Sequence, residues 1–209
     1  MNVAPPPSTT DIRLRPATVA DKDAVAALVS LVDLQQPAEK VSAVLDGMQQ
    51  ALQATEGEAL SHSRVSFLIA EGPNGQQVGL AVCGLAKWMT EAPRVLRHQL
   101  IRRFATVQVL AVRPDSRQQG IARALLQQTE QSFREAGYQA LTLRHGRELT
   151  SFYEKVGYTS AARLSLLLPA ETRLTLADRG WRQAFKILSP SVSTTERQGH
   201  PAIIDHFSD

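Results

Sequence analysis

The stretch T-V-Q-V-L-A-V-R-P-D-S-R-Q-Q-G-I-A-R-A-L-L, residues 106–126, decides the fold. Residues 106–112 are mostly β-branched or apolar and stop before Pro114, which predicts a buried strand. Asp115 and Ser116 then favour a turn. From Gln118 onward, apolar residues recur at helical spacing as far as Gly137, a natural helix stop. The stretch therefore predicts a strand, a glycine-containing turn and a helix.

The residue types in this turn suit a bound phosphate. The first turn of a helix leaves backbone N–H groups without partners and carries the positive end of the helix dipole. Gly120 and Ala122 keep that backbone accessible, and Arg117 and Arg123 add positive charge. The sequence matches neither a P-loop nor the G-x-G-x-x-G dinucleotide motif. The alternative is an ordinary strand, turn and helix with a glycine at a tight start.

Two segments resemble motifs of the GNAT superfamily of N-acetyltransferases. R-Q-Q-G-I-A, residues 117–122, is similar to the family's R/Q-x-x-G-x-G/A motif, and the preceding L-A-V-R-P resembles its fourth strand. S-F-Y-E-K-V-G-Y, residues 151–158, resembles the F-Y-x-K-x-G-F/Y segment that follows its fifth strand. The resemblance extends over residues 11–168.

The resemblance implies an α/β (α+β) fold with a mixed, mostly antiparallel central sheet of about six to seven strands flanked by about four helices. We expect residues 1–10 to be a disordered leader, residues 11–168 to be the acetyltransferase domain, and residues 169–209 to be an extension of uncertain structure. Within the extension, residues 174–188 suit a helix or a strand pair, and residues 189–209 suit a loosely ordered tail.

Hydrophobic periodicity and turn residues predict further elements. A capping box, Thr18 to Asp21, is expected to open the first helix after a short strand that Pro16 ends. Cys83, inside an expected hairpin, is interpreted as a small buried hydrophobe. The other expected strands are at residues 65–70, 78–85, 140–143 and 158–168. Further helices are expected from Pro37 to about residue 54 and at residues 149–156.

The resemblance implies acetyl-CoA as the cosubstrate. The strand-four backbone would meet the pantetheine amides, the turn would hold the pyrophosphate, and Arg123 would reach the ribose phosphate. The implied cofactor-binding residues are Leu110, Ala111, Val112, Arg117, Gln118, Gln119, Gly120, Ile121, Ala122 and Arg123.

The resemblance also supplies one catalytic candidate, Tyr153, as the acid that protonates the departing thiolate. Its helical spacing with Leu149 and Val156 suits a core aromatic equally well. No base is evident, because Thr106 and Gln108 stand where family members often carry a glutamate. Glu71, Glu91 and His145 are weak candidates, and a water chain to solvent is the alternative.

Residues 87–103 precede strand four and carry several cations. In this family the connection often borders the acceptor site, so Trp88, Glu91 and His98 are candidate substrate contacts. A solvated basic loop anchored by Trp88 is the other interpretation, and we favour it.

Composition excludes several function classes. The 209 residues carry a net charge of +3 spread along the chain, which does not favour a nucleic-acid partner. The single cysteine, the lack of a signal-like start and the shortness of the longest apolar run, residues 24–32, favour a cytoplasmic protein without membrane contact. No pattern indicates a metal site. We expect a monomer or homodimer.

The expected function is acetyl transfer from acetyl-CoA to a primary amine of a small molecule or protein, by direct attack in a ternary complex. The alternative is a non-catalytic acyl-CoA-binding protein with the same fold.

Overall fold

The computed structural model describes residues 12–32, 38–55, 57, 60, 65–169 and 173–205, so the expected leader lies outside the described residues. Within them the helices are α1 (Lys22–Val29), α2 (Ala38–Thr55), α3 (Lys87–Thr90), α4 (Arg94–Arg103), α5 (Ile121–Glu135) and α6 (Thr150–Lys155). The strands are β1 (Arg13–Pro16), β2 (Ser66–Glu71), β3 (Gln77–Gly84), β4 (Phe104–Val112), β5 (Ala140–His145), β6 (Thr159–Ala161), β7 (Leu164–Leu167), β8 (Arg173–Leu176), β9 (Arg182–Ile187), β10 (Ser193–Arg197) and β11 (His200–Ile204).

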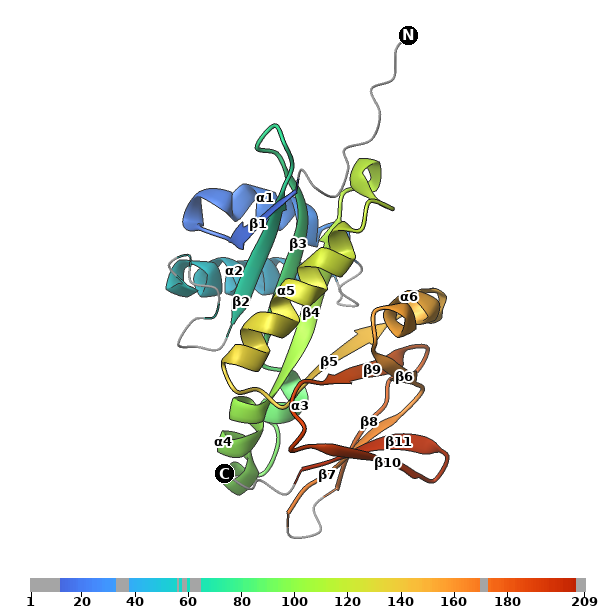
Figure 1. Cartoon of the computed structure of the whole chain (residues 1–209). Helices are drawn as coiled ribbons and strands as arrows, with labels where there is room; N and C mark the ends of the chain where they lie inside the picture. The colour runs from blue at the N-terminus through green and yellow to red at the C-terminus, as the bar shows by residue number, and fades with distance from the viewer. Residues whose placement is uncertain are drawn as a thin grey trace. The chain divides into compact units, whose positions relative to one another are not determined.

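These strands form two sheets in the described part of the chain. The larger has seven strands in the order β1-β2-β3-β4-β5-β9-β6, and the smaller has four in the order β10-β11-β7-β8 (Figure 1). In the larger sheet β4 and β5 run parallel, whereas β1-β2, β2-β3, β5-β9 and β9-β6 are antiparallel. The predicted mixed α/β fold with a mostly antiparallel central sheet is confirmed, with six described helices rather than about four.

The chain divides into two compact units, which are described separately. The first comprises Met1–Gly84 and Gln108–Ser132. On one face of its strands, α1 and α2 bury a cluster that includes Val29, Leu52 and Phe67. On the other face, α5 buries Ile121 and Leu125 against β2 and β3. Figure 1 shows α5 and the α1–α2 pair on opposite sides of these strands.

The predicted capping box is present at the start of the first unit. The backbone N–H of Thr18 donates to the Asp21 carboxylate at 2.8 Å, and the Thr18 hydroxyl lies 3.1 Å from the same oxygen. Arg15 pairs with Asp21 and with Glu71, each at 2.7 Å. These hydrogen bonds lower the pKa of Asp21 to about 2, with Arg15 the largest cause. The two ion pairs of Arg15 therefore link β1 to the start of α1 and to β2.

The end of α5 nearest the turn packs closely on β3. A Cβ added at Gly79 would lie 3.0 Å from Ile121 Cγ2 and 3.1 Å from Leu125 Cδ1. A larger residue at position 79 would therefore require these neighbours to shift. Cys83, four residues further along β3, is buried, and burial raises the pKa of its thiol. The interpretation of Cys83 as a buried hydrophobe is confirmed.

The second unit comprises Leu85–Val107 and Phe133–Asp209. Its main cluster joins α3, α4, β5, β9 and the four-stranded sheet, with Met89, Leu100, Phe104 and Leu166 fully buried. Trp88 packs edge-on against Phe104, with ring centroids 6.2 Å apart. Among the described helices of the chain, none is long and apolar enough to cross a bilayer.

The structure corrects the interpretation of residues 87–103 as a solvated loop. They form α3 and α4, because Leu96 and Leu100 face the core while Arg94, Arg97 and Arg102 cover the exposed side. The high charge of this segment hid its amphipathic pattern.

The structure also corrects two expectations for the C-terminal half. Residues 158–168 form two strands in different sheets, since the chain leaves the large sheet after Ala161 and enters the small one at Leu164. Residues 189–209, expected to be loosely ordered, include the hairpin of β10 and β11. Its turn uses positive φ angles at Gln198 and Gly199. For residues 174–188, the strand-pair alternative is the one observed, as β8 and β9.

Candidate functional site

The predicted strand, turn and helix is present in the first unit. After β4, a short 3₁₀ turn at Pro114–Ser116 leads to a segment in which Gln118 and Gly120 adopt positive φ angles of 62° and 79°. The first backbone hydrogen bond of α5 joins the Ala124 N–H to the Gly120 carbonyl at 3.0 Å. The amides of Ile121, Ala122 and Arg123 therefore precede the intrahelical ladder, as at any helix start.

The side chains of this turn leave it accessible. Arg117, Gln118, Gly120 and Arg123 are exposed, and Ile121 alone among the turn residues is buried. Arg117 folds back so that its Nε donates to the Val112 carbonyl at 3.2 Å, close to the end of β4. The predicted cofactor residues on β4 and on the turn are thus brought together within one unit.

The strand-four residues serve mainly as packing in the first unit. Ala111 is buried against the α1–α2 side, while Leu110 and Val112 are partly buried on the α5 side with Ile121 and Leu125. Any contact of these three residues with a ligand would therefore use their backbone groups.

Tyr153 lies in the second unit, on α6, inside a cluster of rings. Its ring centroid lies 4.7 Å from that of His145, 5.1 Å from Phe152 and 5.9 Å from Tyr158. The side chain is buried, and burial raises the pKa of its phenol to about 12. Its hydroxyl has no hydrogen-bond partner among the described residues. Tyr153 is therefore a core aromatic, and its role as the acid stays a prediction.

The weak base candidates all have other partners. Glu71 pairs with Arg15 at 2.7 Å. Glu91 is exposed and pairs with Lys87 at 3.4 Å. His145 is buried, and its Nε2 lies 2.8 Å from the Ser160 hydroxyl. Thr106, where a glutamate is common in the family, lies with its hydroxyl 2.7 Å from that of Thr142.

The candidate acceptor residues belong to parts of the second unit other than the ring cluster around Tyr153. Trp88 belongs to the main cluster of the second unit, Glu91 follows α3, and His98 is an exposed residue of α4. Trp88 has Phe104 as its aromatic neighbour. The structure does not join these three residues to the ring cluster around Tyr153.

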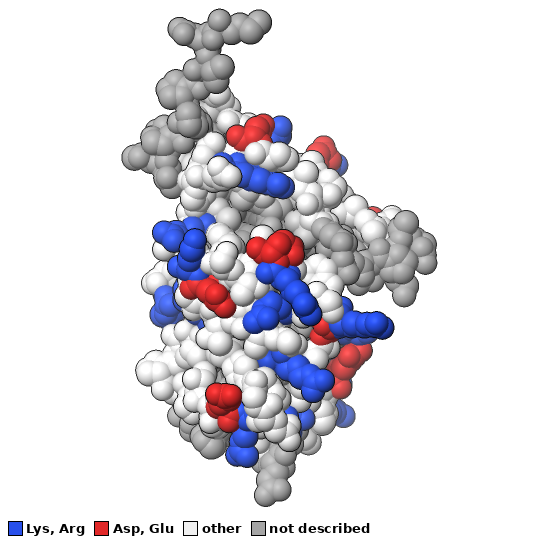
Figure 2. All heavy atoms as spheres, turned by 90° about the vertical axis from the view of Figure 1, so that its right-hand side faces the viewer, with Lys and Arg blue, Asp and Glu red and all other residues white. Residues whose placement is uncertain are grey.

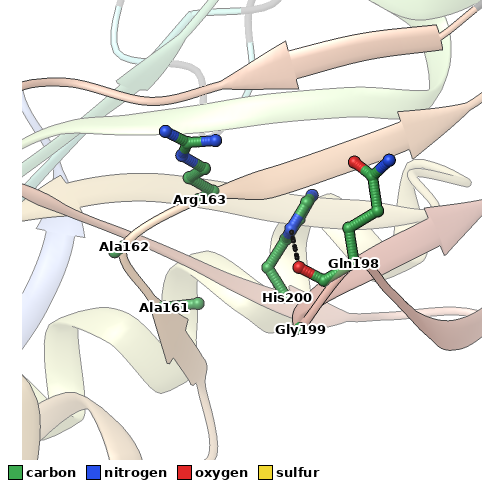
Figure 3. A pocket seen from close by; sticks show the side chains of 6 residues that line it. All are labelled: Ala161, Ala162, Arg163, Gln198, Gly199 and His200. Atoms are coloured by element: carbon green, nitrogen blue, oxygen red, sulfur yellow. Dashed lines mark hydrogen bonds between the residues drawn. The ribbon is translucent and has the colours of Figure 1, made fainter.

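A surface hollow in the second unit contains none of the predicted site residues. Its volume is about 280 Å³, and it is lined by Ala161, Ala162, Arg163, Gln198, Gly199 and His200 (Figure 3). His200 is fixed at its wall, because its ring nitrogens lie 2.9 Å from the Ser165 hydroxyl and 3.3 Å from the Gln198 carbonyl. Among the described residues, no group of three or more His, Cys, Asp or Glu side chains suits a metal ion.

Sequence reasoning missed Ser160 and Arg182, which lie beside His145. Arg182 donates from Nε to the Ser160 hydroxyl at 2.9 Å and from Nη2 to the Ser160 carbonyl at 2.8 Å. No motif marks either residue, because the contact depends on the pairing of β9 with both β5 and β6.

The sequence was compared with known families. Residues 91–164 match the model of the acetyltransferase (GNAT) domain, a segment that includes β4, the turn, α5 and Tyr153. No curated protein matches the chain. The matched segment, about a third of the chain, is similar to the acetyltransferase (GNAT) domain. The chain has the fold of solved GNAT acetyltransferases.

Several solved structures share this fold at low sequence identity. Phosphinothricin acetyltransferase from Sinorhizobium meliloti, in complex with acetyl-CoA, aligns with a TM-score of 0.58 and 14% identity over 90% of this chain and 95% of its own. The protein yncA from Salmonella typhimurium, also with acetyl-CoA, aligns with a TM-score of 0.55 and 15% identity. The alignment covers 86% of this chain and 95% of its own. Spermidine N-acetyltransferase SpeG from Vibrio cholerae aligns with a TM-score of 0.54 and 15% identity. The alignment covers 86% of this chain and 95% of its own.

Proposed function

We propose that this protein transfers the acetyl group of acetyl-CoA to a primary amine of a small molecule or protein. The observation that carries this proposal is the exposed turn at residues 117–122, with left-handed Gln118 and Gly120 at the start of α5, inside the segment that matches the GNAT domain. The acetyl-CoA complexes of the Sinorhizobium and Salmonella proteins support the choice of cosubstrate.

In this proposal the pyrophosphate of acetyl-CoA binds at the first turn of α5. The amides of Ile121 to Arg123 and the helix dipole favour an anion there, and glycine at position 120 lets the phosphates approach the backbone. The exposed guanidinium groups of Arg117 and Arg123 add charge-assisted hydrogen bonds. The backbone of Leu110 to Val112 would then pair with the pantetheine amides.

The proposed chemistry is direct attack. The neutral amine nitrogen attacks the thioester carbonyl carbon, a backbone N–H of β4 stabilises the oxyanion, and the carbon–sulfur bond then breaks. Tyr153 hydrogen-bonds to or protonates the departing thiolate. Its raised pKa keeps the phenol protonated at neutral pH, which this role requires. The amine proton leaves through water to solvent, since Glu71, Glu91 and His145 are engaged elsewhere.

The engagement of Glu71, Glu91 and His145 with other partners favours a second candidate, a non-catalytic acyl-CoA-binding protein. In that case acetyl-CoA binds at the α5 turn, and Tyr153 is a core aromatic only. Trp88 and Glu91 remain the proposed acceptor contacts.

A nucleic-acid acceptor is not proposed. On the face shown in Figure 2, basic and acidic side chains are interspersed, without the continuous basic stripe that such a partner needs. The proposal also keeps a cytoplasmic location, monomer or homodimer formation, and residues 11–168 as the acetyltransferase domain.

One experiment separates the two candidate functions. Calorimetry measures acetyl-CoA binding, and release of free CoA is followed over a panel of alkyl amines and lysine peptides. Binding with turnover on at least one amine supports the enzyme. Binding without turnover on the panel supports the binding protein. Absence of acetyl-CoA binding contradicts both.

A further inference from the structure

Three polar residues from neighbouring strands meet on one face of the sheet in the second unit. His145 on β5 is the register partner of Arg182 on β9. Ser160 on β6 pairs with Ala184 of β9, two residues beyond Arg182. Alternation along the strands places the side chains of His145, Arg182 and Ser160 on the same face. This is the face against which Tyr153 of α6 packs.

The hydrogen bonds among these residues have one consistent direction. The Gly146 carbonyl, 2.7 Å from Nδ1 of His145, can only accept, so Nδ1 carries the proton. Arg182 donates to the Ser160 oxygen at 2.9 Å, which leaves the serine hydroxyl free to donate to Nε2 of His145 at 2.8 Å. This arrangement fits a neutral imidazole protonated at Nδ1. Burial, the largest cause, lowers its pKa, and the charge of Arg182 acts in the same direction.

His145 contacts Tyr153 through its ring. The imidazole and the phenol lie 4.7 Å apart at an interplanar angle of 35°, a tilted stack. Because both ring nitrogens of His145 are engaged, the imidazole cannot rotate without breaking a hydrogen bond. The phenol hydroxyl has no partner among the described residues, so ring packing alone fixes its direction.

We propose that His145, held by Ser160 and Arg182, is a positioning residue that fixes the ring of Tyr153 so that its hydroxyl stays directed at the leaving thiolate. The inference rests on the proposed acetyl transfer and adds to it a set of residues that act on the reaction through Tyr153. The Ser160 hydroxyl lies 2.8 Å from Nε2 of His145, and in this proposal it acts on the phenol through that ring.

The test uses a second Ser–His pair in the same unit as its control. Ser160→Ala removes the hydroxyl between Arg182 and His145, and Ser165→Ala removes the hydroxyl 2.9 Å from Nε2 of His200. Both substitutions should lower the melting temperature by similar amounts. Ser160→Ala alone should lower kcat, by about tenfold, with less than about a twofold change in the KM for acetyl-CoA. Ser160→Thr, which keeps the hydroxyl, should restore kcat.

A double variant distinguishes positioning from a general loss of structure. In a Tyr153→Phe background, Ser160→Ala should cause no further fall in kcat, because the phenol through which it acts is absent. Equal falls in kcat for Ser160→Ala and Ser165→Ala, or a full effect of Ser160→Ala in the Tyr153→Phe background, would overturn the proposal.

A spectroscopic readout separates this inference from the proposed function. With ¹³C-labelled tyrosine, the NMR spectrum contains signals from Tyr138, Tyr153 and Tyr158. The signal that is missing from Tyr153→Phe belongs to Tyr153. Ser160→Ala should shift the Tyr153 signal, and Ser165→Ala should not. If the wild-type protein turns over no amine but this shift occurs, the proposed catalysis fails and the positioning contact stands. If the Tyr153 signal does not shift, the positioning contact is wrong whatever the activity.

Discussion

Arg103, the last residue of α4, forms an ion pair with Asp205, which follows β11, with Nη1 and Oδ1 3.3 Å apart. The side chains are 10% and 2% exposed. Removing one member of a buried ion pair is strongly destabilising. We therefore expect Asp205→Leu to lower the free energy of unfolding by about 3 kcal/mol, and the double variant with Arg103→Leu to lose less than the single one. Urea denaturation measures both, and a larger loss in the double variant would contradict the expectation.

Gly120→Val should weaken acetyl-CoA binding by about tenfold or more, because a branched side chain blocks the phosphates at the start of α5. Gly137→Val is the matched control. Gly137 also has a positive φ, 83°, lies just beyond the other end of α5, and has open space around it. Both variants should lose similar stability, and calorimetry should show weaker binding for Gly120→Val alone. Equal binding by the two variants would refute the assigned turn.

Gly79→Val tests the close packing of β3 on α5. The new side chain would meet Ile121, Leu125 and the Ala111 carbonyl, so we expect a loss of about 1–3 kcal/mol in unfolding free energy. Displacement of the helix start should also weaken acetyl-CoA binding. Gly84→Ala, on the same strand, meets its neighbours at 3.4 Å or more and should change little. Chemical denaturation and calorimetry on both variants provide the test.

Tyr153→Phe should lower kcat by about 100-fold if the phenol acts as an acid, while the KM for acetyl-CoA stays nearly constant. Tyr138→Phe is the control, since Tyr138 packs on Phe133 with ring centroids 4.8 Å apart and has no ring contact with Tyr153. Steady-state kinetics measure both. Unchanged turnover in Tyr153→Phe would leave Tyr153 as a core residue only.

The raised pKa of Tyr153, about 12, makes a separate prediction about pH. The phenol remains protonated throughout the range in which alkyl amines lose their protons, near a pKa of about 10.4. The rate should therefore rise with pH as the amine deprotonates, without a fall due to Tyr153 up to about pH 10. A rate that declines above about pH 9, at constant folded fraction, would contradict the assigned environment.

Asp21 should contribute to stability in a narrow acidic range. Its folded-state pKa of about 2 lies below the ordinary value of 3.8, so its contribution is complete above about pH 4 and is lost as the pH falls towards 2. We expect a contribution of about 1 kcal/mol, reduced by solvent screening at the partly exposed Arg15. Urea denaturation at pH 5 and pH 2.5 should show this loss in the wild type and not in Asp21→Asn.

Local signals predicted the parts of the fold that local interactions determine. Pro16 ends β1, the Thr18–Asp21 capping box precedes α1, and Gly137 follows α5, as expected. The strand, turn and helix at 104–135 was predictable because its residue types are restricted at consecutive positions.

The missed elements depend on contacts between distant residues. The break between β6 and β7 carries no glycine or proline, and the hairpin of β10 and β11 turns at Gln-Gly rather than at a stronger turn pair. The partners of Tyr153 were equally inaccessible, because His145 and Ser160 are linked only through strand pairing with β9.

The position of β9 has a consequence for synthesis of the chain. Residues 182–187 lie between β5 and β6 and pair with both, although both are made earlier. A nascent chain ending near residue 168 would expose the unpaired edge of β5 and leave β6 without a neighbour. This part of the sheet therefore closes only after β9 has left the ribosome, so a stop before residue 182 should yield an aggregating fragment.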